Sequence, residues 1–90
     1  MNKQNLKKLL QQDPVALKIL RFFLQNPSSV DSVGGIATWV NAGREEVTSS
    51  LGKLTEEGAL EEDTSGSMTG YSLTEDEEDL KKIQDVSENA

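Results

Sequence analysis

The residue types that most often carry out catalysis or bind metals are missing from this chain. Its 90 residues include no cysteine and no histidine, which removes the thiolate and imidazole groups that serve as metal ligands, nucleophiles and general bases. A serine nucleophile would need a lysine partner, and nothing in the sequence places the two together. The phosphate-binding patterns GxGxxG and GxxxxGK[ST] are also absent. We therefore expect a protein that is not an enzyme and that has no cofactor and no bound metal.

Two other features could indicate a ligand site. The acidic run Glu75–Asp79 lacks the spacing and the glycine of a calcium loop, so we expect it to complement the positive end of a helix dipole. Trp39 could be a stacking platform for a ligand. Its position beside Val40 on a short helical segment instead favours partial burial in the core.

The polar side chains best placed for binding lie on segment 43–57. Val47, Leu51 and Leu54 recur at i, i+4 and i+7, so an α-helix would gather them on one face. Gly58 follows where the end of a helix favours a residue with positive φ. With the apolar face inward, the outward positions are Arg44, Glu45, Thr48, Ser49, Gly52 and Lys53. These outward residues must carry any binding.

The rest of the chain divides into segments that would position this helix. Apolar periodicity and turn signals predict helices at 1–12, 14–26, 32–41, 43–57 and 75–86, and a hairpin at 59–73. Asp13-Pro14 joins the first two helices as N-cap and first helical residue, and residues 28–30 are expected to form a loop. Two closely joined helices followed by a hairpin are the arrangement that presents a recognition helix to DNA.

The ends of these segments carry further expectations. Thr74 with Glu77 predicts a capping box for the last helix. Gly34 and Gly35 are each less favourable in a helix than alanine by about 1 kcal/mol, so fraying is expected at the start of segment 32–41. Residues 1–87 should form a single domain, and residues 88–90 a disordered tail.

Charge is distributed unevenly along the chain. The net charge is −7. Residues 1–60 carry seven Lys and Arg against six Asp and Glu, whereas residues 61–90 carry two against ten. No apolar run approaches the roughly 20 residues that cross a bilayer, and the first residues lack the apolar centre of a signal peptide. We expect an acidic, cytoplasmic protein that does not associate with membranes.

The motifs IATWVNAGREEVTSSLGKLTEEGALEE and GYSLTEDEEDLKKI resemble the winged helix-turn-helix superfamily, and specifically small bacterial and archaeal transcriptional regulators of the MarR and ArsR kind. The positions that match the pattern are Ile36, Ala37, Val40, Val47, Leu51, Leu54, Gly58, Leu60, Tyr71, Leu73 and Thr74. The resemblance covers about residues 14–86. It implies a mostly α fold with a small β-hairpin (α+β): a three-helix core, a wing and a C-terminal helix.

The resemblance also implies a function. The helix 43–57 would enter the major groove of double-stranded DNA, with Arg44 reaching a guanine edge and Thr48 and Ser49 touching bases or phosphates. Lys53, Lys18 and Arg21 would neutralise phosphates. Such regulators often dimerise through their terminal helices, so a homodimer is implied as well. Metal sensing of the kind that needs Cys or His ligands is excluded.

Several residues depart from this pattern and support an alternative. Glu45 and Glu46 lie where a DNA backbone would pass, Glu62 and Asp63 replace basic residues of the wing, and the wing tip has no Lys or Arg. The alternative is a protein-interaction winged helix, an adaptor or regulatory subunit that does not bind DNA. Its docking or dimer surface would use the apolar residues of the terminal helices, Leu6, Leu9, Leu10, Leu80 and Ile83. Leu6, Leu9 and Leu10 could equally pack on the core of their own domain.

Overall fold

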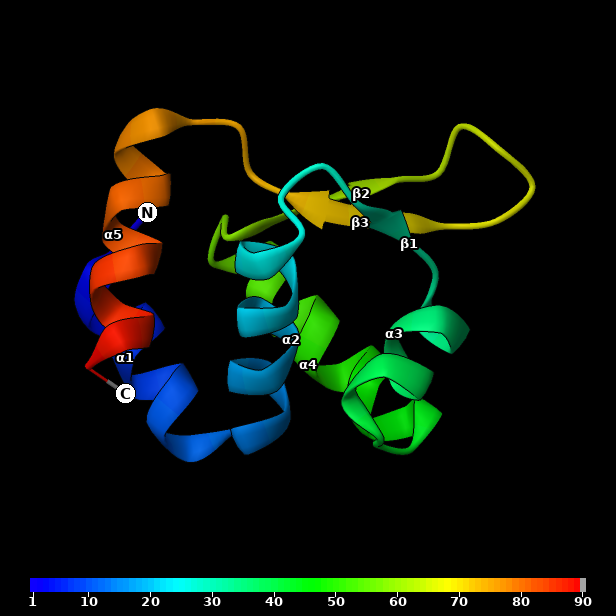
Figure 1. Ribbon diagram of the computed structural model, residues 1–90, viewed down its shortest axis with the longest axis horizontal. Helices are drawn as coiled ribbons and strands as arrows, with labels where there is room; N and C mark the ends of the chain where they lie inside the picture. The colour runs from blue at the N-terminus through cyan, green and yellow to red at the C-terminus, as the bar shows by residue number, and fades with distance from the viewer. Residues whose placement is uncertain (90) are drawn as a thin grey trace.

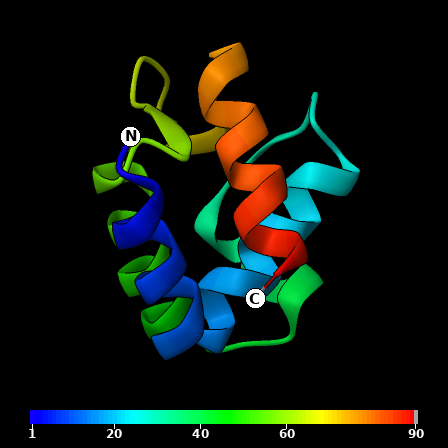
Figure 2. The same cartoon turned by 90° about the vertical axis from the view of Figure 1, so that its left-hand side faces the viewer.

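The computed structural model describes residues 1–89, which form helices around a small sheet (Figure 1). In chain order the elements are α1 (Lys3–Gln12), α2 (Pro14–Gln25), β1 (Val30–Asp31), α3 (Val33–Val40), α4 (Arg44–Glu56), β2 (Leu60–Asp63), β3 (Gly70–Leu73) and α5 (Glu77–Glu88). Helices α2, α3 and α4 pack on one another, and the sheet lies across one end of α2. Helices α1 and α5 lie side by side on the other flank, as both views show (Figures 1 and 2).

The sheet is antiparallel with the strand order β1-β3-β2. Leu60 pairs with Leu73 at one end of the hairpin and Asp63 with Gly70 at the other. Tyr71 and Leu73 point inward and are buried, as the alternation of strand residues predicts. Strands β2 and β3 with the long loop between them form the wing, and this loop extends beyond the helices (Figure 1).

One apolar core joins all five helices to the sheet. Its fully buried members come from every helix and include Leu6, Ile19, Phe23, Ile36, Leu51, Leu54 and Ile83. The periodic face predicted for α4 is confirmed, because Val47, Leu51 and Leu54 have no exposed area. This burial holds the opposite face of α4 outward.

Helices α3 and α4, which form the helix-turn-helix, are each followed by a residue with positive φ. Asn41 closes α3 in the left-handed conformation, with φ of 55°. After α4, Gly58 has φ of 85°. The N–H of Ala59 donates to the carbonyl of Leu54 at 3.0 Å. This is the glycine stop that the sequence predicts.

The start of α3 differs from the prediction of fraying. Ser32 caps the helix, with its side chain accepting a hydrogen bond from the N–H of Gly35. A β-carbon at Gly35 would collide with the carboxylate of Asp31. Gly35 therefore leaves room for the Asp31 side chain in its present position, and the helix is formed from Val33 onward.

Other predicted boundaries also need correction. The predicted loop at 28–30 contains the start of β1, where Val30 pairs with Ser72. Helix α5 is capped by Asp76, which accepts from the N–H of Asp79, rather than by Thr74. It continues through Glu88, so the tail predicted at 88–90 is wrong for Glu88, and Ala90 lies outside the described residues.

Trp39 is the clearest departure from the predicted core. Its side chain is 70% exposed, although partial burial was expected from its apolar surroundings in the sequence. Ile36, Ala37 and Val40 occupy the inward face of α3. Trp39 is left at the edge of that face, where its ring lies against Phe22 at a centroid distance of 5.5 Å.

Candidate nucleic-acid interface

The outward face of α4 carries the residues predicted to bind DNA. Arg44, Thr48, Ser49 and Lys53 are all exposed, while Ser50 between them is buried. The hydroxyl of Thr48 donates to the carbonyl of Arg44 at 2.7 Å, so its donor is already used within the helix. Arg44, Ser49 and Lys53 are therefore the residues of this set whose donors no described hydrogen bond occupies, although Lys53 has an ion pair.

Arg44 lies where three elements meet. Together with Ser32, Val33 and Gly34 of the α3 start, and Met68 and Thr69 of the wing, it lines a hollow of about 230 Å³. The guanidinium passes over the α3 start, since a β-carbon built at Gly34 would be 3.5 Å from Arg44 Nη1. No acidic residue lines this hollow. Because the Asp31 carboxylate already lies against the first turn of α3 at Gly35, Arg44 rather than the helix N-terminus is the group that can attract a phosphate here.

Lys53 lies at the other end of the exposed face and has an acidic partner. Its ammonium is 3.7 Å from Asp13 Oδ2, the atom that also accepts a hydrogen bond from the buried Ser50 hydroxyl at 2.7 Å. Sequence reasoning missed Ser50, whose polar side chain gives no signal that it is buried. The pair is too long for a hydrogen bond and the Lys53 side chain is 53% exposed, so Lys53 can still turn toward a phosphate.

Lys18 and Arg21 do not join the α4 face. Both are on α2, where they line a different hollow together with Phe22 and Trp39, and no α4 residue contributes to it. Arg21 donates to the carbonyl of Ser87 on α5 at 3.3 Å. The six residues predicted as one DNA site are therefore divided between two surfaces.

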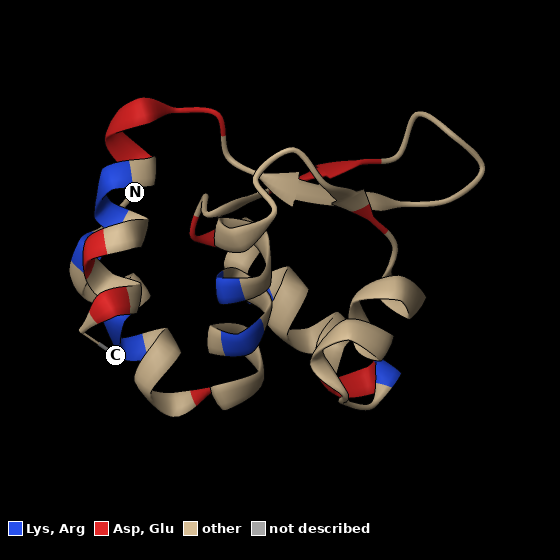
Figure 3. Cartoon of the chain, viewed as in Figure 1, with Lys and Arg blue, Asp and Glu red and all other residues tan. Residues whose placement is uncertain are grey.

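Acidic residues flank the candidate interface. Glu45 and Glu46 occupy the first turn of α4, where they complement the helix dipole, and Figure 3 shows acidic and basic residues adjacent at this point. On the wing, Glu61, Glu62 and Asp63 of β2 are exposed. The pKa of Asp63 is lowered by hydrogen bonds from the backbone and the side chain of Ser65, which stabilise the charged form.

The apolar residues predicted as a docking surface lie mostly inside the protein. Leu6, Leu10 and Ile83 are buried between α1, α2 and α5, with at most 2% of their area exposed. Leu9 and Leu80 are half-buried at the edge of the core. The α1 leucines could either pack on their own domain or form a docking surface, and Leu6 and Leu10 pack on their own domain. These side chains are not available to a partner in this fold.

Within residues 1–89, no group of three or more His, Cys, Asp or Glu side chains is arranged to hold a metal ion. Over the same residues, no helix is both long enough and apolar enough to span a lipid bilayer.

Comparisons with known proteins identify the fold. No protein-family model and no curated protein sequence match the chain. Among solved structures, a possible transcriptional regulator from Methanosarcina mazei Go1 is similar with a TM-score of 0.70 and 18% identity, over 96% of this chain and 76% of that one. The transcriptional repressor BigR from Xylella fastidiosa is similar with a TM-score of 0.68 and 24% identity, over 94% of this chain and 79% of that one. The predicted winged helix-turn-helix fold is thereby confirmed.

Proposed function

We propose that this chain, which has the winged-helix fold of transcriptional regulators, binds double-stranded DNA and regulates transcription without enzymatic activity. Helix α4 would lie in the major groove, with Arg44 contacting a guanine or a phosphate and Ser49 and Lys53 the adjoining backbone. The observation that supports this best is the hollow formed by Arg44, the α3 start and the wing, which no acidic residue lines. A regulator of this kind works in the cytoplasm.

The proposal is tested by titrating the labelled protein with duplex DNA at low salt while following its amide resonances. We expect shifts concentrated at Arg44–Lys53 and at Thr69, and we expect them to disappear as salt is added. Replacing Arg44 with Ala should weaken binding to a specific site by about 1–3 kcal/mol. Lys81→Ala, an equal loss of charge on exposed α5, is the control and should have a much smaller effect.

A converse variant makes the test sharper. Glu46→Gln removes a negative charge from the first turn of α4 and should strengthen DNA binding if this helix faces the duplex, because it removes repulsion from phosphates. Glu78→Gln, a matched change in the first turn of α5, should not. If neither Arg44→Ala nor Glu46→Gln changes the affinity, α4 is not the DNA-binding element.

We also propose that the chain acts as a homodimer, as binding to a two-fold symmetric site requires. The half-buried Leu9 and Leu80 at the edge of α1 and α5 are the apolar side chains these helices could still offer. A solution mass of a single 9.8 kDa chain at high protein concentration would contradict the dimer but not monomeric DNA binding.

The second candidate function is that of a protein-interaction winged helix. It is favoured by one observation, the exposed acidic row Glu61, Glu62 and Asp63 on β2, where a DNA-binding wing needs positive charge. The absence of any amide shift at high DNA concentration would rule out the first function and favour this one.

A further inference from the structure

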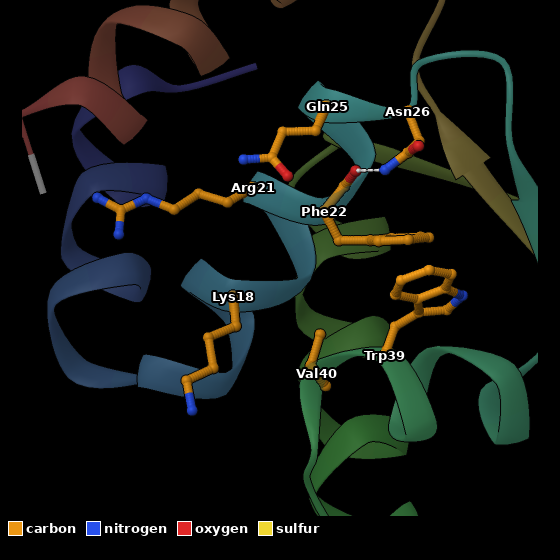
Figure 4. A pocket seen from close by; sticks show the side chains of 7 residues that line it. All are labelled: Lys18, Arg21, Phe22, Gln25, Asn26, Trp39 and Val40. Atoms are coloured by element: carbon orange, nitrogen blue, oxygen red, sulfur yellow. Dashed lines mark hydrogen bonds between the residues drawn. The ribbon is translucent and has the colours of Figure 1, made fainter.

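A second hollow lies between α2 and α3, on a different surface from the α4 face. It has a volume of about 320 Å³ and is lined by Lys18, Arg21, Phe22, Gln25, Asn26, Trp39 and Val40. Figure 4 shows the rings of Phe22 and Trp39 on the α3 side of the hollow and the side chains of Lys18, Arg21 and Gln25 on the opposite side. Its volume is at the lower end of the range for small-molecule sites, about 300–1,000 Å³.

The aromatic side of the hollow is held in place by the core. Trp39 lies against Phe22 with a tilt of 31° between the rings, and Phe22 meets the fully buried Phe23 edge to face at 5.1 Å. Part of the indole is thus in contact with an aromatic side chain that itself rests on the core. With 70% of its area exposed, Trp39 presents its remaining surface to a ligand, and planar rings stack well on such a platform.

The opposite side of the hollow is positively charged. Lys18 is exposed and forms no ion pair or hydrogen bond with any residue in 1–89. Arg21 keeps its hydrogen bond to the Ser87 carbonyl and adds a second positive charge. Although the chain has 16 acidic residues, none of them lines the hollow. Such an arrangement favours an anion.

We propose that this hollow binds a small anion built on a planar ring, with the ring stacked on Trp39 and the anionic group directed toward Lys18. A nucleoside monophosphate and an aromatic carboxylate share this chemistry. The proposal goes beyond DNA binding and does not depend on it, because no α4 residue lines the hollow. Val40 lies at its base and is also part of the core, so a bound ligand would contact the first helix of the helix-turn-helix.

Trp39 is the only tryptophan of the chain, so its fluorescence and its indole N–H resonance report on this hollow directly. The probes are AMP, adenosine and inorganic phosphate, which separate the ring from the anion, and benzoate with benzyl alcohol, which repeat the comparison on a smaller ring. We expect AMP to perturb Trp39 at concentrations at which adenosine and phosphate alone do not. If benzoate perturbs Trp39 at concentrations at which benzyl alcohol does not, and AMP has no effect, the site would be assigned to aromatic carboxylates.

A pair of lysine variants tests the charged side. Lys18→Gln should weaken the binding of AMP or benzoate by about tenfold, as expected for loss of a charge-assisted contact. Lys7→Gln removes the same charge from exposed α1 and should leave the affinity unchanged. Because both residues are exposed, both variants should fold.

Four outcomes would overturn the proposal. If AMP binds no more tightly than adenosine, and benzoate no more tightly than benzyl alcohol, no anion is recognised. Equal affinity for phosphate and AMP would show that the ring is not bound. Equal effects of Lys18→Gln and Lys7→Gln would exclude Lys18 as the anion contact. No change at Trp39 with any probe would show that the hollow is not a site for this class of ligand.

Discussion

At the scale of single residues, Asp13 connects three helices. Its backbone N–H donates to the carbonyl of Leu9 in the last turn of α1, and its Oδ1 accepts from the N–H groups of Val15 and Ala16 at the start of α2. Its Oδ2 accepts from Ser50 of α4. The sequence predicts only the second of these roles. One carboxylate therefore fixes α4 relative to the helices that precede it.

We expect Asp13→Ala to lower the free energy of unfolding by about 2 kcal/mol, since it removes an N-cap and leaves the buried Ser50 hydroxyl without its acceptor. Asp13→Asn should lose much less, because asparagine is an equally good N-cap. Urea denaturation of both variants measures the difference. A double-mutant cycle with Ser50→Ala should show coupling between the two sites, and strict additivity would contradict the direct contact.

Tyr71 gives the wing a pH dependence at alkaline pH. Burial raises the pKa of its phenol, and the charge of Glu62 and the hydrogen bond that the phenol donates to Glu62 Oε1 raise it further. Since the pKa is higher in the folded than in the unfolded chain, this group's contribution to stability is complete below the unfolded value. It is lost as the pH rises through the folded pKa.

The absorbance of tyrosinate measures this pKa without ambiguity, because Tyr71 is the only tyrosine. We expect a midpoint above that of free tyrosine, and Glu62→Gln should move it downward. Glu61→Gln, at an exposed position of the same strand whose partner is Ser72, should move it less. If both variants lower the pKa of Tyr71 equally, the combined negative charge of the wing rather than the contact with Glu62 raises it.

At the scale of elements, Gly52 within α4 and Gly58 just after its end should respond in opposite ways to replacement by alanine. A β-carbon would meet no atom within 4 Å at either Gly52 or Gly58, so packing does not distinguish them. Gly58→Ala should destabilise the fold by about 1–2 kcal/mol, because φ is positive there. Gly52→Ala should stabilise it by about 0.5–1 kcal/mol, since it lies within the helix.

Thermal unfolding of the two alanine variants, with the wild type as reference, measures both changes in one experiment. Opposite shifts in the melting temperature are expected. A loss of stability in Gly52→Ala would mean that α4 is not an ordinary exposed helix at this point.

The sequence predicts the long elements better than the short ones. Three apolar residues at helical spacing and a glycine at the end are enough to predict α4, and Pro14 after a capping aspartate is enough to predict α2. Strand β1 has two residues, too few to show alternation, and it exists because Ser72 and Tyr71 are brought to it from far along the chain. The cap of α5 was misplaced because Thr74 and Asp76 are both good caps, and only the path after β3 selects Asp76.

At the scale of the whole molecule, the arrangement of the elements decides which binding residues meet. The sequence predicts that Arg44, Thr48, Ser49 and Lys53 are exposed, and they are. It does not predict that Arg44 and Thr69 of the wing line one hollow, nor that Lys18 and Trp39 line another. Those neighbours depend on how α3 and the wing are placed, which the spacing of residues within one helix does not determine.

The pairing of α1 with α5 has a consequence for how the protein is made. Leu6 and Leu10 are synthesised long before α5, but they share their core with Ile83 and Val86 of that helix. Until α5 has been synthesised, the first helix has no partner on that flank and its leucines stay exposed to water and to other nascent chains. The docking of α1 should therefore wait until α5 has been made, and this interval is when the chain is most exposed to aggregation or to capture by a chaperone.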